Sequence, residues 1–276
     1  MTKIKKKSLT HRKIARYGWT PDLPDHRDHL YSAPLLKLGP LPARVDLRPE
    51  CPAVYDQGQI GSCTANAIAA AIEFDLLKQK IADFMPSRLF IYYNERNLEH
   101  TVNTDSGAQI RDGIKTVNKL GVCPETEWPY DAVPADPNTN VWPPDAPPAE
   151  RPTTACYKDA LKHQVVSYQR LNPDLSQMKG CLAAGYPFVL GFTVYDAFES
   201  AAVAQSGVLN LPTSTEQVVG GHAVMAVGYD DTAQRFIIRN SWGADWGQKG
   251  YFTMPYAYLI TGNLADDFWT IRMVEG

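Results

Sequence analysis

Residues 56–80 read DQGQIGSCTANAIAAAIEFDLLKQK. From Thr64 to about Lys80 the apolar residues recur near helical spacing and no Gly or Pro interrupts them, so this stretch predicts a helix. Cys63 opens that helix, where unpaired N–H groups and a positive partial charge favour the thiolate form of its sulfur. A lone cysteine is more often a small buried apolar residue, yet this setting favours a nucleophile.

The residues just before Cys63 support the same interpretation. Gly58 and Gly61 allow the backbone to come close to a ligand. Gln57 offers a side-chain amide donor that would help to hold a developing oxyanion. We therefore expect acyl-transfer chemistry at the start of this helix.

A cysteine nucleophile that must later protonate a leaving amine needs a partner that titrates near neutrality, and histidine is that residue. Of the six histidines, His222 lies in VVGGHAVMAVGYDD, residues 218–231. The glycine pair before it indicates a close approach of the backbone to something else. A purely structural histidine at the start of a buried strand is the alternative, and the glycines favour catalysis.

The third signal is FIIRNSWGADWGQKGYFTM, residues 236–254, in which an apolar strand ends at Asn240. The Asn240 side chain would accept a ring N–H from a histidine and so fix its tautomer, while Trp242 would shield that hydrogen bond from water. A turn asparagine beside a packed tryptophan cluster is the other interpretation of this segment.

Together these residues resemble the papain family of cysteine peptidases in their order and local settings. VDLR at 45–48 looks like a mature papain-type start, GVCPETEWPY at 121–130 is similar to another family segment, and the resemblance covers roughly residues 41–260. It implies an endopeptidase that hydrolyses peptide bonds through a thioester on the nucleophile. The implied oxyanion donor, nucleophile, base and orienting residue are Gln57, Cys63, His222 and Asn240.

The resemblance also implies where an extended peptide substrate binds. The backbone of Gly107, in a glycine-containing loop, would pair with the peptide, and a pocket would receive the second residue before the cut. The implied substrate-binding residues are Ser106, Gly107, Ala108, Ile110, Gly191, Gly221, Ala223 and Trp242.

The chain departs from the family pattern in three ways. Ile60 replaces a cysteine that usually forms a disulfide in this motif, and Thr64 replaces the usual aromatic residue after the nucleophile. His222 and Asn240 also lie further from the nucleophile than the roughly 130 to 150 residues typical of the pattern. Surface insertions at the proline-rich stretch 131–153 and at 199–219 would absorb the difference.

The order of the elements predicts an α+β fold of two lobes. Helical spacing at 86–98 and 108–120 follows the first helix, whereas β-branched and aromatic runs dominate after residue 156. We expect a papain-like peptidase domain at 41–276, with a helical lobe at about 41–155, an antiparallel β-rich lobe at about 156–276, and the active-site cleft between them. The expected strands are Val165–Leu171, Pro187–Val194, Ala223–Tyr229 and Phe236–Asn240, with one helix among them at about Leu175–Ala184.

Residues 1–40 form an extension that lacks the long helical prodomain of papain-like zymogens. Residues 1–16 hold seven Lys or Arg and no acid, as a solvated tail or an arm that binds nucleic acid or a membrane surface would. Residues 17–40 mix aromatic, apolar, Pro and Asp residues, so we expect an ordered regulatory segment that covers the cleft and inhibits the enzyme. The stretch GWTPDLPDHRD, residues 18–28, resembles N-terminal segments of bacterial members of the family.

Composition narrows the remaining function classes. The 276 residues are 44% hydrophobic and 21% charged with a net charge of −3, which is typical of a soluble globular protein and gives no global field for nucleic acid. No apolar run would span a bilayer and none follows the basic start, which predicts a cytoplasmic location; non-classical secretion or a removed leader would leave the same pattern. Peptides or proteins are the expected partners.

Neither a metal nor a cofactor is expected, because CxxC and HExxH spacings, a P-loop and a dinucleotide fingerprint are absent. With five cysteines at least one thiol is free, and the pairing of Cys51, Cys123, Cys156 and Cys181 stays open. The rival functions are an amidase, transglutaminase-like or deubiquitinating enzyme, which the NSWG segment disfavours, and a binding module that has lost activity, which the intact catalytic set disfavours.

Overall fold

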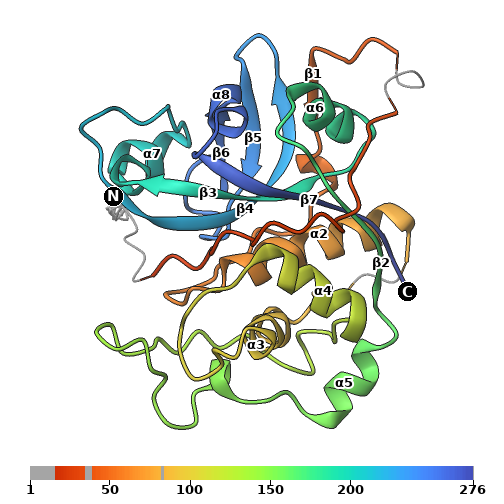
Figure 1. The fold of residues 1–276 in the computed structure, drawn as a ribbon, viewed down its shortest axis with the longest axis vertical. Helices are drawn as coiled ribbons and strands as arrows, with labels where there is room; N and C mark the ends of the chain where they lie inside the picture. Colours follow the sequence, from red (N-terminus) through yellow and green to blue (C-terminus); the bar gives the residue numbers. More distant parts are fainter. Residues whose placement is uncertain (1–15, 35–38, 82–83, 276) are drawn as a thin grey trace, which may run out of the picture.

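The computed structural model describes residues 16–34, 39–81 and 84–275. The predicted basic tail lies outside the described residues apart from Arg16, as do residues 35–38 of the predicted covering segment. Figure 1 shows a β-rich lobe above a helical lobe, with an extended N-terminal chain running between them.

Within the described residues the lower lobe consists of four helices, of which α2 is the central one. α2 (Cys63–Gln79) begins at the predicted nucleophile and ends where Lys80 adopts a left-handed conformation, and its residues 63–76 are all buried. α3 (Arg88–Leu98) starts two residues later than predicted, because the Ser87 side chain accepts a hydrogen bond from Phe90 N–H and caps the helix there. α4 (Ile110–Leu120) and α5 (Thr154–Ala160) complete the set.

The upper lobe is one antiparallel sheet in the order β2-β7-β3-β4-β5-β6, with β1 added on β4. Three further helices, α6 (Leu175–Ala183), α7 (Ala201–Ser206) and α8 (Tyr256–Ile260), lie around it (Figure 1). Short 3-10 turns occur at Arg48–Glu50, Pro147–Ala149 and Asp196–Glu199. The strands are β1 (Arg44–Asp46), β2 (Val165–Arg170), β3 (Phe188–Tyr195), β4 (Val218–Asp230), β5 (Arg235–Arg239), β6 (Tyr251–Pro255) and β7 (Ala265–Val274).

The predicted α+β, two-lobed class is confirmed, and the boundary between the lobes differs from the expected one in two places. β1 precedes every helix of the lower lobe, yet it pairs with β4 in the sheet. α5 begins before residue 156 and continues past it, and its Tyr157 packs on Phe90 of α3 with ring centroids 4.9 Å apart. The upper lobe therefore includes β1 from the N-terminal part of the chain, and the lower lobe includes all of α5.

The core is continuous from one lobe to the other because α2 contacts β4 and β7 on one side and α3 and α4 on the other. This explains why its apolar residues surround the helix instead of forming one stripe.

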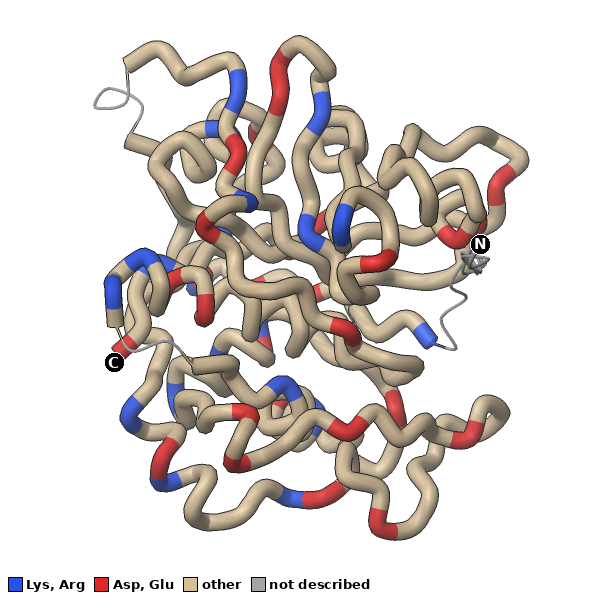
Figure 2. Tube along the Cα trace, turned by 180° about the vertical axis from the view of Figure 1, so that it is seen from behind, with Lys and Arg blue, Asp and Glu red and all other residues tan. Residues whose placement is uncertain are grey.

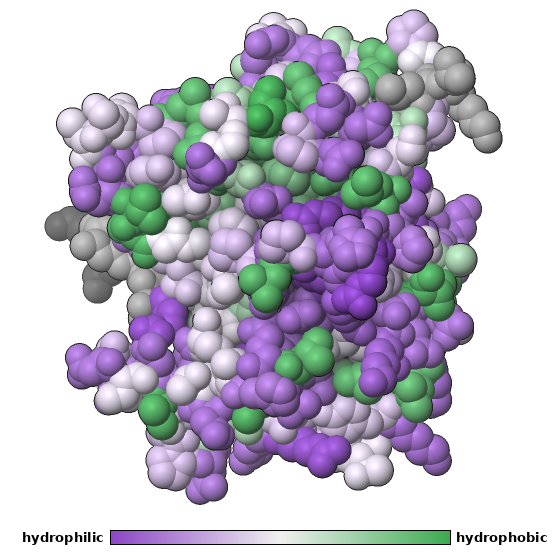
Figure 3. Space-filling model, in the orientation of Figure 1, coloured by the Kyte–Doolittle hydropathy of each residue, from purple (hydrophilic) through white to green (hydrophobic). Residues whose placement is uncertain are grey.

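At the surface, Figure 3 shows apolar side chains scattered among polar ones. Figure 2 shows acidic and basic positions interspersed along the described chain. No helix among the described residues has the length and apolar character needed to cross a membrane.

Residues 16–34, which we call the N-terminal segment, lie between the lobes as an extended chain (Figure 1). Trp19 forms a parallel bridge with Ala108 of the lower lobe, and its N–H donates to the Gly221 carbonyl of the upper lobe at 2.9 Å. Further along, Leu30 forms a second parallel bridge with Arg170 of β2. The N-terminal segment is thus hydrogen-bonded to both lobes.

Candidate active site

Cys63 lies at the first position of α2 and has no solvent-exposed surface. Burial raises the pKa of its thiol to about 12, and the charge of Glu95 adds to that effect. The nearby backbone N–H groups of Ala223, Gly18 and Thr64 act in the opposite direction and lower the pKa, because they favour the thiolate. The thiol therefore stays protonated while the N-terminal segment covers it, although the donors that would stabilise a thiolate already surround it.

His222 and Asn240 are brought together by neighbouring strands. His222 lies in β4 and Asn240 directly follows β5, and the Nε2 of His222 is 2.8 Å from Oδ1 of Asn240. Ser241 N–H donates to the same oxygen at 2.9 Å, so this oxygen is an acceptor and Nε2 carries the proton. Nδ1 is therefore the ring nitrogen left to exchange a proton with a nucleophile.

An aromatic cluster encloses this pair. The ring centroid of Trp242 lies 5.3 Å from that of His222, and Phe198 and Phe192 contact the imidazole from other sides. His222 itself is fully buried and Asn240 is nearly so. The His222–Asn240 hydrogen bond is shielded from water, as expected for a group that must hold one tautomer.

Gln57 is fixed by hydrogen bonds at both ends of its side-chain amide. Its Oε1 accepts from the Ser241 hydroxyl at 2.6 Å, and its Nε2 donates to the Ile60 carbonyl at 3.0 Å. Its backbone N–H donates to the Ser241 carbonyl at 2.9 Å. The amide is positioned beside the Asn240–Ser241 corner, and its oxyanion role remains a prediction.

Thr64, which stands in place of the aromatic residue typical of the family, has a specific partner. Its hydroxyl donates to the Glu95 carboxyl at 2.6 Å inside the lower lobe. Burial raises the pKa of Glu95 well above its ordinary range. The hydroxyl thus satisfies one oxygen of a buried acid that an aromatic side chain would leave without that donor.

The expected substrate loop faces the N-terminal segment, with the pairing shifted by one residue. Ala108 N–H donates to the Gly18 carbonyl at 2.8 Å, and Thr20 N–H donates to the Ala108 carbonyl at 3.1 Å. Gly107, the predicted pairing residue, has its N–H directed to the Tyr92 hydroxyl at 3.2 Å and a positive φ of 70°. In this closed form Ala108, and not Gly107, pairs with the N-terminal segment, and the pairing of Gly107 with a peptide substrate stays a prediction.

The expected pocket holds the indole ring of Trp19. A Cβ atom at Gly191 would overlap this ring, and one at Gly221 would lie 2.7 Å from it. Ala223 is the cross-strand partner of Gly191 and lies beside the Cys63 sulfur. Of the other predicted residues, Ile110 is buried at the start of α4, whereas Ser106 is exposed and its hydroxyl donates to Thr101 at 2.8 Å.

Several functional contacts were missed from the sequence. Asp267 accepts from Trp19 Nε1 at 3.0 Å, Glu199 accepts from the Tyr17 hydroxyl at 3.0 Å, and Asp105 accepts from Gly61 N–H at 3.0 Å. The only signal for Asp267 is the acidic pair that precedes the apolar run FWTI, residues 268–271.

A buried cluster of charges holds the N-terminal segment next to this pocket. Asp28 accepts from Arg111 at 2.6 and 3.0 Å and from Arg170 at 3.3 Å. Asp22 accepts from the Arg111 backbone N–H and from Trp269 Nε1, each at 3.0 Å. Burial raises the pKa of Asp22, although these donors and both arginines oppose the rise.

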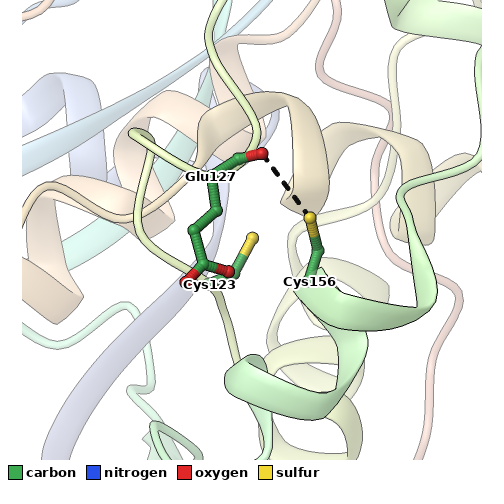
Figure 4. A group of neighbouring side chains, drawn as sticks. All are labelled: Cys123, Glu127 and Cys156. Atoms are coloured by element: carbon green, nitrogen blue, oxygen red, sulfur yellow. Dashed lines mark hydrogen bonds between the residues drawn. The ribbon is translucent and has the colours of Figure 1, made fainter.

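Cys123, Glu127 and Cys156 form a group of candidate metal ligands (Figure 4). The donor atoms of Cys123, Glu127 and Cys156 lie within 4.8 Å of one another, with both cysteines buried and Glu127 exposed. Three donors are fewer than the four of a structural zinc site, and burial holds the pKa of the Cys123 thiol high. We assign no metal to it. All five cysteines are free thiols.

Comparison with known proteins agrees with this geometry. The model of the papain family cysteine proteases matches residues 41–264. A peptidase C1-like protein of Acanthamoeba polyphaga mimivirus is 42% identical over 283 residues, which cover 94% of this chain and 87% of that protein. The crystal structure of xylellain, a cysteine protease from Xylella fastidiosa, is 50% identical with a TM-score of 0.89 and covers 99% of both chains.

More distant solved structures share the fold. A digestive procathepsin L 3 of Tenebrio molitor is 20% identical with a TM-score of 0.65, covering 88% of this chain and 73% of its own. The expected resemblance to bacterial members is confirmed by the xylellain match. With the family model covering most of the chain, the protein belongs to the papain family of cysteine proteases and is a cysteine endopeptidase.

Proposed function

We propose that this endopeptidase is held inactive by its own N-terminal segment and cleaves peptides once that segment leaves the cleft. The observation that carries the proposal is the position of Gly18, which lies on the nucleophile. Its N–H lies near enough to the Cys63 sulfur to lower the pKa of the thiol, and a Cβ atom at Gly18 would overlap the Gly61 carbonyl. No substrate can reach Cys63 in this arrangement.

The open form would use the groups already in place. Removal of the N-terminal segment lowers the burial that raises the Cys63 pKa, so the thiol can pass its proton to Nδ1 of His222. The sulfur then attacks the peptide carbonyl, and the Cys63 N–H and the Gln57 amide stabilise the oxyanion. His222 protonates the departing amine and afterwards deprotonates the water that hydrolyses the thioester.

The N-terminal segment is arranged as an inhibitor and not as a substrate. Gly18 presents its N–H to the sulfur, whereas its carbonyl accepts from Ala108 N–H at 2.8 Å. A scissile carbonyl would instead have to face the sulfur with its oxygen towards the oxyanion donors. The chain can therefore lie across the nucleophile without being cut.

The test is the rate at which E-64, an epoxide that alkylates papain-type cysteines, labels the protein. We expect slow labelling of the full chain and fast labelling of a chain that lacks residues 1–40, with the adduct mapped to Cys63. A synthetic peptide of residues 16–34 should slow the labelling of the truncated chain again. A Cys63→Ser chain, which should take up no adduct, is the matched control.

Equal labelling rates for the two chains would contradict inhibition by the N-terminal segment. Absence of labelling and of peptide hydrolysis in a truncated chain that melts cooperatively would instead contradict the proposed chemistry. The two outcomes separate the regulatory and the catalytic parts of the proposal.

A further inference from the structure

The pocket that holds Trp19 has a charged floor. Oδ2 of Asp267 accepts from Trp19 Nε1 at 3.0 Å and from Asp22 N–H at 2.7 Å, while Oδ1 pairs with Arg170 at 3.0 Å. The Asp267 side chain has no exposed surface. Two of the donors to this carboxylate therefore belong to the N-terminal segment, and one belongs to the body of the enzyme.

A register irregularity in β7 determines the direction of the Asp267 side chain. The pairing of β7 with β3 shifts register between Val189 and Gly191, and Asp267 adopts a φ of 56° at the shift. A bulge of this kind redirects a side chain that would otherwise follow the alternation of the strand. A left-handed conformation is unfavourable for a residue with a Cβ atom, so its presence beside a pocket is a sign of a functional constraint.

Departure of the N-terminal segment leaves Oδ2 without both of these donors. A buried acceptor without a donor is costly, and a bound side chain that supplies an N–H recovers that cost. The surface around the acceptor is flat, because the Trp19 ring lies directly on Gly191 and Gly221. A planar two-ring side chain with a ring N–H fits both requirements.

We propose that Asp267 makes this pocket selective for tryptophan as the second residue before the cut. The inference rests on the proposed function, because it takes Trp19 to occupy the place of a substrate side chain. The position in the substrate follows the family resemblance of the pocket residues.

A cationic side chain is disfavoured by the charges that stay behind. Asp22 and Asp28 leave with the N-terminal segment, and the body then retains Arg111 and Arg170 against Asp266, Asp267 and Glu99. Burial raises the pKa of Glu99 to about 7, so near neutrality this carboxyl adds only part of a charge and Lys or Arg gains little net attraction. A neutral N–H donor keeps the hydrogen bond without displacing Arg170.

The experiment uses the full chain opened by Gly18→Val and a set of peptides that differ only in the second residue before the cut. Tryptophan is compared with 1-naphthylalanine, which has a similar two-ring shape without the N–H, and with arginine. We expect kcat/KM for the tryptophan peptide to exceed that for naphthylalanine by about 10-fold. Asp267→Leu should remove this ratio, whereas Asp266→Leu, at an exposed neighbour that also contacts Arg170, should keep it.

Equal kcat/KM values for tryptophan and naphthylalanine, or faster turnover of the arginine peptide, would overturn the inference while the protease function stands. If the opened chain cleaves no peptide and takes up no E-64, the proposed function fails instead. Should Asp267→Leu not melt cooperatively, the ratio measured with Asp267 in place still decides, and Asp267→Asn offers a milder variant that keeps an acceptor oxygen.

A second inference comes from the thiol pair Cys123 and Cys156. Cys123 is fixed by its carbonyl, which accepts from Ser87 N–H at 2.9 Å, and the Cys156 sulfur accepts from the Thr153 hydroxyl at 3.1 Å. The two sulfurs lie within 4.8 Å of each other (Figure 4). The sulfur of Cys181, by contrast, contacts no other cysteine in these hydrogen bonds: it accepts from Arg272 at 3.8 Å and donates to the Tyr186 carbonyl at 3.5 Å.

We infer that Cys123 and Cys156 form a disulfide when the protein meets a small-molecule disulfide such as oxidised glutathione. The Cys156 thiolate attacks that disulfide and releases one thiol, and the Cys123 thiolate then displaces the second thiol from the mixed disulfide. The protein loses two electrons and two protons, which the two released thiols carry away. The new bond closes a loop around the proline-rich stretch 131–153.

The full chain with Cys63→Ser, which removes the active-site thiol, is treated with oxidised glutathione and mapped by mass spectrometry without reduction. We expect a linked Cys123–Cys156 peptide pair, and a Tm about 5 °C above that of the reduced protein. Cys123→Ser should abolish both effects and Cys181→Ser should keep both. Alkylation of both Cys123 and Cys156 in denaturant after this treatment would overturn the inference, and so would a linked pair that lowers the Tm.

Discussion

The two halves of the N-terminal segment are held in different ways. Residues 16–20 bind mainly by shape and backbone hydrogen bonds, with Gly18 fitted onto Gly61 and Trp19 paired to both lobes. The side chains of Tyr17 and Trp19 add one hydrogen bond each, to Glu199 and Asp267. Residues 22–30 bind through buried charges, with Asp22 and Asp28 on Arg111 and Arg170. The first half covers the nucleophile, and we expect the charges of the second half to contribute to the affinity.

This difference indicates that the N-terminal segment covers the nucleophile and binds to the enzyme through separate groups of residues. Substitutions in the first half should open the nucleophile at any pH, whereas changes in the second half should act through electrostatics and depend on pH. The predictions below test this division, from the largest expected effect to the smallest.

Gly18→Val should displace residues 16–20 from the nucleophile. Its side chain would overlap the Gly61 carbonyl, which is backbone and cannot move aside cheaply. We expect the full chain to be labelled by E-64 about 100-fold faster, a change of about 2.7 kcal/mol in the closing equilibrium. Gly262→Val, whose Cβ meets nothing within 4 Å, is the control and should label like the parent. A slow Gly18→Val chain would show that the close fit does not hold the cleft shut.

Asp28→Asn should weaken the binding of residues 22–30 to the enzyme. The substitution leaves the buried Arg111 without its ion-pair partner, although the Leu23 carbonyl still accepts from its guanidinium. We expect about 10-fold weaker inhibition of the truncated enzyme by the peptide of residues 16–34. Asp25→Asn is matched to it, because Asp25 pairs with Arg27, which is 78% exposed, and should change inhibition little. Equal effects of the two variants would contradict a role for burial.

Closure should weaken as pH rises, by several-fold between pH 5 and 8. Burial, together with the nearby Asp22 charge, raises the pKa of Asp267 to about 7, and burial raises that of Asp22. A raised pKa means that the closed form binds protons more tightly than the open form. These carboxyls therefore contribute their full stabilisation of the closed form below about pH 4, and this contribution is lost as pH rises through about 7. The charged groups that face this pair are Arg111, Arg170, Asp28, Glu99 and Asp266.

Hydrogen exchange of the Trp19 and Ala108 amides in the Cys63→Ser chain, corrected for intrinsic rates, would measure this effect. The Asp267→Asn variant should show a smaller pH dependence, because one of the two coupled carboxyls is removed. Protection that increases from pH 5 to 8 would contradict the predicted sign.

Tyr17→Phe should have the smallest effect. The variant loses the hydrogen bond from the Tyr17 hydroxyl to Glu199, at 3.0 Å, but keeps the edge contact with the His222 ring at 5.9 Å. We expect about threefold faster E-64 labelling of the full chain. Tyr17→Ala, which removes both contacts, should exceed it, and equal rates for the two variants would assign the effect to the hydroxyl alone.

Much of the catalytic arrangement was predictable from the sequence, because each residue carries a local signal. Cys63 opens a long uninterrupted helix, His222 follows a glycine pair, and Asn240 ends an apolar strand before Trp242. Such signals depend on residues adjacent in the chain. The helices at 88–98 and 110–120 were predicted for the same reason, to within two residues at their starts.

What could not be predicted depends on residues far apart in the chain. The Asp267 floor requires a bulge in β7 and a tryptophan nearly 250 positions away, and neither leaves a periodic pattern. The strands β1, β6 and β7 were also missed, although the aromatic and β-branched residues of β6 and β7 are a composition typical of strands. The Ala108 pairing depends on Tyr92 already binding the Gly107 N–H.

The pairing of β1 with β4 has a further consequence for how the enzyme is switched on. Nine residues of sequence separate the N-terminal segment from β1, which is fixed in the sheet through Arg44–Asp46, so the proposed inhibitor and the enzyme would be joined at an effective concentration of about a millimolar. On the proposed function, inhibition would be independent of protein concentration until one peptide bond between the N-terminal segment and Arg44 is cut. After that cut the released peptide would be diluted into the solution and would close the cleft only at a high peptide concentration.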